Sequence, residues 1–214
     1  MTRYLYLHGF ASGPQSSKGV YLRDRFQERN VSLQLLDLNQ ADFSHLTLTR
    51  QIEQVEAELA DTDAPVTLVG SSLGGLTSVW VAERNPQVTR LVLLAPAFRF
   101  VRRWRDRLGA DAIAQWRSRG YFDIYHYAEK RTLPLHINFL DDAERYDETH
   151  LQRKVPTLVL HGRSDDVVPI SASQAYASRR PWVELVELDS DHALGDVKAD
   201  IWQATERFCA NELG

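Results

Sequence analysis

The chain has 214 residues, of which 43% are apolar and 25% charged, a composition typical of one soluble globular domain. Its 29 acidic side chains outnumber the 25 basic ones, and the net charge of -4 supplies no general positive field for nucleic acid or an anionic membrane. The single cysteine, Cys209, excludes an internal disulfide and fits a reducing compartment.

Short runs rich in Val, Leu and Tyr recur along the chain and predict strands. Most of these runs are continuously apolar, which is typical of strands covered on both faces in a mainly parallel sheet. Segments with helical periodicity alternate with them, so the sequence predicts an α/β fold with helices on both faces of the sheet. The expected strands are 4–8, 33–38, 66–70, 91–95, 157–161 and 183–188, and the expected helices are 16–28, 47–59, 73–83, 171–177 and 196–210.

Residues 97–150 interrupt this alternation. The segment holds ten aromatic side chains, nearly half of those in the chain, and a run of five arginines. An insertion of this length between two strands is usually a functional loop, a lid or a small helical subdomain. We therefore expect residues 1–214 to form one domain with a helical lid at 97–150, in which Trp104, Trp116 and Tyr121 line a substrate pocket. The alternative is that the aromatic side chains pack this segment onto the core and that the arginines form its solvated face.

The sharpest motif is Gly70-Ser71-Ser72-Leu73-Gly74, a G-x-S-x-G between an expected strand and an expected helix. A serine at such a turn has strained backbone geometry, and the residues two before and two after it must be small. Ser72 has this glycine spacing on both sides, whereas Ser71 does not. The strand before the motif and the helix after it favour a nucleophilic serine over a simple glycine-rich turn.

A serine nucleophile needs a base, and the base needs a carboxylate to hold its tautomer. In folds that carry this motif the order along the chain is serine, acid, histidine. His192 lies in a polar loop after the last expected strand, which favours it among the seven histidines. Asp165 follows the strand at 157–161 and is the expected acid. The neighbouring Asp166 could serve a structural role, in a turn or as a helix cap.

An oxyanion hole requires two backbone N–H groups directed at the attacked carbonyl. Leu73 follows the nucleophile and is expected to supply one of them. The second is expected from the loop after the first strand, where His8-Gly9-Phe10 points to the N–H of Phe10. A plain glycine turn is the alternative for this tripeptide.

Together, four segments make the chain resemble the α/β-hydrolase superfamily: His-Gly-Phe at 8–10, Gly-Ser-Ser-Leu-Gly-Gly at 70–75, His-Gly-Arg-Ser-Asp-Asp-Val-Val-Pro at 161–169 and Ser-Asp-His at 190–192. Within the superfamily the chain is similar to small bacterial esterases of the YqiA/YcfP type and to the mitochondrial acyl-protein thioesterase branch. The resemblance implies a sheet of about six strands, because the chain starts directly at the strand that bears the oxyanion loop. It also implies a serine hydrolase in which Ser72 attacks an acyl carbonyl, His192 acts as base and then acid, and Asp165 orients His192.

The expected substrates are small carboxylic esters or thioesters. Cleavage of small peptides and a catalytically silent binding module of the same fold are the alternatives. No phosphate-binding glycine loop is present, no zinc-ligand spacing occurs and the chemistry needs no metal, so we expect no cofactor. The chain has no stretch of 18 to 20 apolar residues and no signal-peptide pattern at its start, which favours a cytoplasmic protein without a membrane span.

Overall fold

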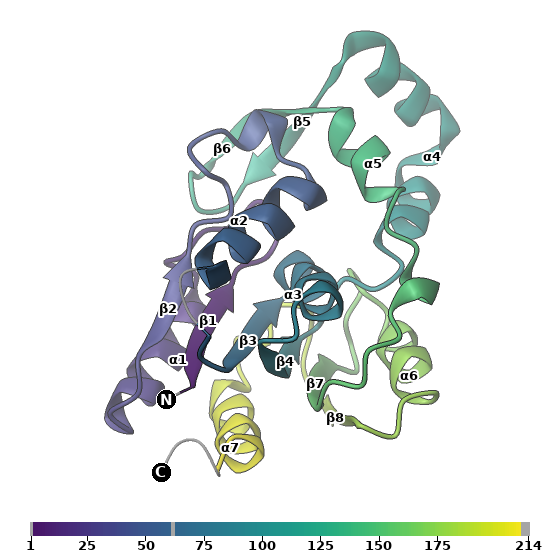
Figure 1. Ribbon diagram of the computed structural model, residues 1–214. Helices are drawn as coiled ribbons and strands as arrows, with labels where there is room; N and C mark the ends of the chain where they lie inside the picture. Colours follow the sequence, from purple (N-terminus) through teal and green to yellow (C-terminus); the bar gives the residue numbers. More distant parts are fainter. Residues whose placement is uncertain (1, 61–62, 211–214) are drawn as a thin grey trace.

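The computed structural model describes residues 2–60 and 63–210 and contains a six-stranded sheet in which every neighbouring pair of strands is parallel (Figure 1). The strand order is β2-β1-β3-β4-β7-β8. All six predicted strands are present, and the apolar side chains of the four central strands are buried, as the continuous apolar runs require. The strands are β1 (Arg3–Leu7), β2 (Leu33–Leu36), β3 (Val66–Ser71), β4 (Val88–Leu94), β7 (Thr157–Gly162) and β8 (Val183–Leu188).

Helices cover both faces of this sheet, which gives the three layers that the sequence predicts (Figure 1). One apolar layer lies between the sheet and the helices α1 and α7, and the other lies between the sheet and α2, α3 and α6. None of the helices in the described ranges is long and apolar enough to cross a membrane. The helices are α1 (Ser17–Glu28), α2 (Leu48–Ala60), α3 (Leu73–Arg84), α6 (Ser171–Ala177) and α7 (Lys198–Phe208), with a 3-10 turn, η1 (Phe43–His45), before α2.

The strand order reverses between β1 and β3. From β1 the chain passes to β2 on one side, and from β3 it passes to β4 on the other, so the loops after β1 and β3 diverge from a common point. In open α/β sheets the crevice at such a reversal, outside the carboxyl ends of the strands, is where ligands bind. The topology therefore places the loop at residues 8–13 beside the turn that contains Ser72.

The segment between β4 and β7 is only partly helical. A two-stranded antiparallel hairpin stands inside it (Figure 1), an element that the predicted helical lid did not include. Gly120 ends the preceding helix with a φ of 79°, and alternate residues of the next strand then face inward and outward, the period of a strand. The elements are α4 (Phe100–Arg119), which is kinked at Gly109, β5 (Tyr121–His126), β6 (Arg131–His136), α5 (Asn138–Ala143) and the 3-10 turn η2 (Glu148–His150).

Candidate active site

Ser72 stands at the sharp turn between β3 and α3. Its backbone adopts φ 52° and ψ -115°, a region that residues with a side chain rarely occupy and that costs conformational energy. The turn can close because its glycines lack a side chain. A Cβ on Gly70 would lie 2.4 Å from the Ser78 Oγ, and a Cβ on Gly74 would lie 2.1 Å from the Leu7 carbonyl oxygen. The spacing of the two glycines is therefore a steric requirement of this turn.

Three side chains from the ends of three strands form a hydrogen-bonded row. His192 Nδ1 lies 2.7 Å from Asp165 Oδ2, and His192 Nε2 lies 3.1 Å from Ser72 Oγ. Ser72 follows β3, Asp165 follows β7 and His192 follows β8, so the parallel sheet brings residues 120 positions apart to one edge. In this arrangement one imidazole nitrogen can exchange a proton with the hydroxyl while the carboxylate holds the other nitrogen.

The Asp165 carboxylate is buried and held from several directions. Its Oδ1 accepts the backbone N–H groups of Val167 at 2.9 Å and Val168 at 2.6 Å. Its Oδ2 lies 3.1 Å from Nε2 of the buried His161, in addition to the contact with His192. Burial disfavours the charged carboxylate, but the hydrogen bonds from His161, His192 and the backbone outweigh burial and hold the pKa of Asp165 well below its usual range. Asp165 is therefore an anion beside His192 at neutral pH.

The loop after β1 lies directly against the serine. A Cβ on Gly9 would lie 3.3 Å from the Ser72 Cβ, so a larger residue would press on the nucleophile. Within the described residues, no protein acceptor takes the backbone N–H of Phe10 or of Leu73. Leu73 is the first residue of α3, and the N–H groups of a first helical turn have no partner inside the helix. Both predicted oxyanion donors therefore remain open to a ligand.

His8 fixes the orientation of the peptide between Gly9 and Phe10. The buried His8 ring accepts the Leu38 N–H at Nε2, at 3.0 Å, so the neutral ring carries its proton on Nδ1. Nδ1 then donates to the Gly9 carbonyl oxygen at 2.9 Å. Because the C=O and N–H of a trans peptide point in opposite directions, holding the Gly9 carbonyl also holds the Phe10 N–H. Sequence reasoning assigned no role to His8, although its place directly before Gly9 was a signal.

Lys18, near the start of α1, is tied to the loop that carries His192. Its ammonium donates to the carbonyl oxygen of Ala193, the residue after His192, at 2.8 Å. Burial lowers the pKa of Lys18 to about 8, against the opposing effect of the charges on Asp165 and Asp191. The contact joins residues 175 positions apart, which no local sequence pattern could indicate.

The Phe10 side chain packs in an aromatic cluster built largely by the segment between β4 and β7. Its ring lies 5.3 Å from Trp104 of α4 in an edge-on arrangement and 5.2 Å from Phe139 of α5 in a stacked one. Phe43 of η1 lies 5.6 Å from the same ring. This Phe10 cluster places apolar surface beside the residue whose N–H is a predicted oxyanion donor.

The other two aromatic residues expected at a substrate pocket are placed differently. Trp116 is only 1% exposed, and its indole N–H donates to the Leu135 carbonyl oxygen, so it packs inside the core and offers no surface to a ligand. Tyr121 lies on the outer side of the hairpin, is 41% exposed, and has its hydroxyl 3.1 Å from His45 Nε2. Of the three predicted residues, Trp104 is the one that contacts the Phe10 ring.

The sequence profile of an uncharacterised protein family, UPF0227, matches residues 3–209. The chain belongs to this family. It is 29% identical over 216 residues to the pimeloyl-[acyl-carrier protein] methyl ester esterase of Xanthomonas campestris pv. campestris, with 85% of each chain covered. It is also 30% identical over 146 residues to the human mitochondrial palmitoyl-protein thioesterase ABHD10, a match that covers 65% of this chain and 47% of that protein.

Solved structures agree on the fold. Mouse alpha/beta hydrolase domain-containing protein 10 superposes with a TM-score of 0.80 and 22% identity, covering 99% of this chain and 90% of that one. Est1E from Butyrivibrio proteoclasticus, in a structure with bound ferulic acid, gives a TM-score of 0.82 and 20% identity, covering 100% and 90%. The protein is therefore an α/β hydrolase related to esterases and thioesterases.

Proposed function

We propose that the protein hydrolyses carboxylic esters or thioesters of small acyl substrates, with Ser72 as the nucleophile. The observation that carries this proposal is the position of the His192 ring, hydrogen-bonded to Asp165 at one nitrogen and to Ser72 at the other. The names of two relatives, an esterase and a thioesterase, support the same class of reaction.

In the first half of the reaction the Ser72 Oγ forms a bond to the acyl carbon while its proton passes to His192 Nε2. Negative charge develops on the carbonyl oxygen, where the N–H groups of Phe10 and Leu73 can donate to it. The bond from carbon to the leaving oxygen or sulfur then breaks, and His192 returns the proton to the leaving group. Throughout, the ionised Asp165 holds the ring by Nδ1 and stabilises its positive charge.

In the second half, water replaces the leaving group. His192 takes a proton from the water as its oxygen attacks the acyl carbon, and the bond to Ser72 Oγ breaks as His192 returns that proton to the serine. The products are a carboxylic acid and the free enzyme. Every proton in both steps moves through His192 Nε2, so one base and one nucleophile suffice.

We further propose that the segment 97–150 covers the mouth of this site and that the Phe10 cluster forms the wall for the acyl group. Trp104 of α4 and Phe139 of α5 both come from this segment and both pack on the Phe10 ring. Binding pockets are mostly apolar with a few placed polar groups, which matches an aromatic wall next to two backbone donors.

A fluorophosphonate probe, combined with p-nitrophenyl esters and acyl thioesters of graded chain length, tests the proposal. The wild-type protein is expected to label at one serine and to hydrolyse the substrates. Ser72→Ala is expected to lose both properties, with turnover reduced by several orders of magnitude, and to keep its melting temperature. Ser71→Ala is the matched control, because its side chain is buried beside the turn. A wild-type protein that neither labels nor turns over would instead indicate a silent binding module of this fold.

A further inference from the structure

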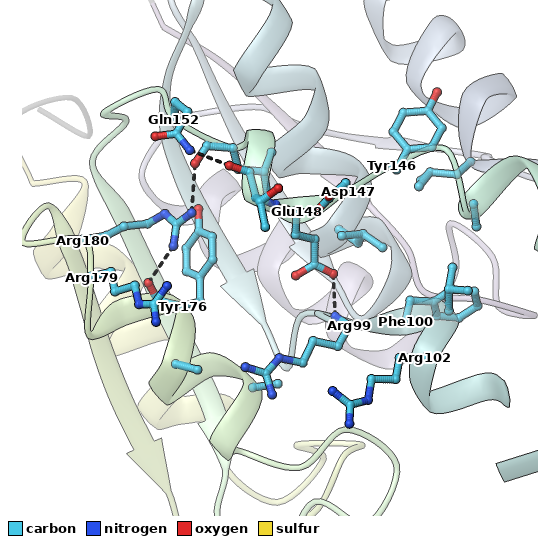
Figure 2. A pocket seen from close by; sticks show the side chains of 18 of the residues that line it. Arg99, Phe100, Arg102, Tyr146, Asp147, Glu148, Gln152, Tyr176, Arg179 and Arg180 are labelled. Atoms are coloured by element: carbon cyan, nitrogen blue, oxygen red, sulfur yellow. Dashed lines mark hydrogen bonds between the residues drawn. The ribbon is translucent and has the colours of Figure 1, made fainter. Parts of the chain in front are cut away.

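A pocket lies outside the row of Ser72, His192 and Asp165, on the side of the sheet covered by α3 and α6. It has a volume of about 720 Å³ and opens between the start of α4, the turn η2 and helix α6, and none of Ser72, Asp165 or His192 lines it. Its size falls within the range of small-molecule sites. Leu76, Phe100, Leu151 and Ala172 contribute apolar surface, and Figure 2 shows charged side chains gathered over it.

The charge of this α4–α6 pocket is positive. Four arginines line it against two carboxylates, Asp147 and Glu148. Figure 2 shows Arg179 and Arg180 on one side and Arg102 on the other, with Glu148 between them. Among the described residues, no carboxylate forms an ion pair with the side chains of Arg99, Arg179 or Arg180. Arg102 pairs with Asp106, so the excess positive charge of the pocket comes from Arg99, Arg179 and Arg180, which outnumber the two lining carboxylates.

Arg180 is held in place without losing its charge. Its guanidinium lies 4.2 Å from the centre of the Tyr176 ring and donates to the carbonyl oxygens of Tyr176 and Leu151, at 3.1 Å and 2.9 Å. These acceptors are neutral, so the hydrogen bonds order the side chain without forming an ion pair. An ordered guanidinium loses less entropy when it binds an anion, which strengthens binding.

Arg99 reaches the pocket from a strained backbone. Its φ is 57°, a left-handed conformation that is uncommon for a residue with a side chain, and the Glu148 carboxylate accepts its N–H. Burial raises the pKa of Glu148 to about 7, in spite of the nearby charges of Arg99 and Arg180. Close to neutral pH a proton therefore removes much of the negative charge that would oppose an anion here.

We propose that the α4–α6 pocket binds a small amphipathic anion, a carboxylate or phosphate group attached to an aliphatic or aromatic body, at a site separate from Ser72. Guanidinium groups bind both kinds of anion through paired hydrogen bonds. The apolar surface of Leu76, Phe100 and Ala172 takes the body of the ligand. This inference does not depend on the reaction proposed for Ser72.

Titration calorimetry on the purified chain tests the proposal with octanoate, octyl phosphate, inorganic phosphate and octan-1-ol. Octanoate or octyl phosphate is expected to bind at one site, and to bind equally well after a fluorophosphonate has blocked Ser72. The comparison of the two octyl compounds identifies the preferred head group. Inorganic phosphate and octan-1-ol are expected to bind at least about tenfold more weakly, because each lacks one half of the ligand.

Two variants locate the site. Arg99→Gly removes the side chain while suiting the left-handed backbone, and Arg179→Ala removes an exposed one, so both are expected to fold. Each is expected to weaken binding about tenfold, while Arg23→Ala, on the surface of α1, leaves it unchanged. Absence of saturable binding at millimolar concentration, loss of binding after Ser72 is blocked, or equal affinity in Arg99→Gly and Arg23→Ala would each overturn the proposal.

The pH dependence gives a further readout. The charged and titratable groups that face Glu148 are Arg99, Arg103, Arg180, Asp147 and the Tyr176 phenol. Because Glu148 takes up a proton near neutral pH, octanoate is expected to bind more tightly at pH 6 than at pH 8. Glu148→Gln is expected to abolish this difference. An affinity that is independent of pH in the wild type would contradict the role of Glu148.

Discussion

Asp165 and Asp166 are adjacent in sequence but differ in surroundings. Asp165 is 7% exposed and contacts His192, His161 and two backbone N–H groups, whereas Asp166 is exposed. The sequence favoured Asp165 as the acid and gave Asp166 a structural role in the turn. The contacts support the first choice, because a carboxylate can orient an imidazole only at hydrogen-bonding distance.

At this residue scale we predict that Asp165→Asn lowers turnover by about three to four orders of magnitude, because an amide in that position favours the wrong tautomer of His192. Asp166→Asn, the matched control, is expected to retain wild-type turnover. Steady-state kinetics on a p-nitrophenyl ester, with circular dichroism to verify folding, measures both. A damaging Asp166→Asn beside a harmless Asp165→Asn would require a different acid.

At the scale of elements, the first turn of α1 supports the loop after β8. Lys18 is the side chain that makes this connection, through the Ala193 carbonyl. It acts on the candidate site through His192, so we regard it as a positioning residue. Lys198 is a suitable comparison, because its ammonium donates to Ser17 Oγ at 3.2 Å and lies 5.5 Å from the centre of the Tyr21 ring, on the same side of the molecule.

We predict that Lys18→Met lowers kcat about tenfold or more with little change in KM, because loss of a hydrogen bond from a charged donor costs about 1.5 to 3 kcal/mol. Lys18→Arg is expected to restore part of the loss, and Lys198→Met to leave kcat unchanged. The pKa of Lys18 is lowered to about 8, so the activity of the wild type is expected to decline above pH 8. The activity of Lys18→Arg is not expected to decline, because a guanidinium keeps its charge at that pH. Equal kinetics for Lys18→Met and the wild type would show that the contact has no positioning role.

The segment between β4 and β7 contains two tryptophans in different environments. Trp104 is partly buried and contacts the Phe10 ring. Trp116 is fully buried, and its indole N–H donates a hydrogen bond to the carbonyl oxygen of Leu135 in the hairpin. Substitutions at the two positions can therefore test separately whether the insertion forms a wall for a ligand or serves as a packing element.

We predict that Trp104→Ala changes the relative turnover of short and long acyl esters more than it changes stability. Trp116→Ala is expected to lower the free energy of unfolding by about 3 to 5 kcal/mol and to leave the chain-length profile unchanged. Urea unfolding and a panel of p-nitrophenyl esters measure these effects. An identical chain-length profile for Trp104→Ala and the wild type would mean that the Phe10 cluster is not the acyl wall.

At the scale of the whole molecule, the half-buried Glu148 links global stability to pH. Its pKa is raised from an ordinary 4.5 to about 7, so between these values the folded chain holds a proton that the unfolded chain has released. The free energy of unfolding therefore falls as pH rises through this window. The largest possible contribution of this shift is about 3 kcal/mol.

We predict that the wild type loses more stability between pH 5 and pH 7.5 than Glu148→Gln does, because the variant has no proton to release at this position. Urea unfolding at the two pH values measures the difference, and the contributions of the other titrating groups cancel in the comparison. Parallel pH profiles for the two proteins would show that Glu148 is ordinarily solvated.

The sequence by itself determined the layered fold and the turn around Ser72. Both depend on local chemistry. The continuous apolar runs predict strands that are covered on both faces. Gly70 and Gly74 lack the side chains that the turn cannot accommodate. The order of Ser72, Asp165 and His192 after three strands also predicted one common edge, because all the strands in this sheet are parallel.

Only the tertiary structure decided which distant groups meet. Four features depend on contacts between separate elements. They are the hairpin inside the insertion, the burial of Trp116, the hydrogen bond from Lys18 to the loop of His192, and the hydrogen bond by which His8 orients the Gly9 peptide. The aromatic composition of the insertion is compatible with both roles, lining a pocket and filling a core. Burial is a property of the packed chain, and a local pattern cannot specify which of two similar side chains the rest of the fold will cover.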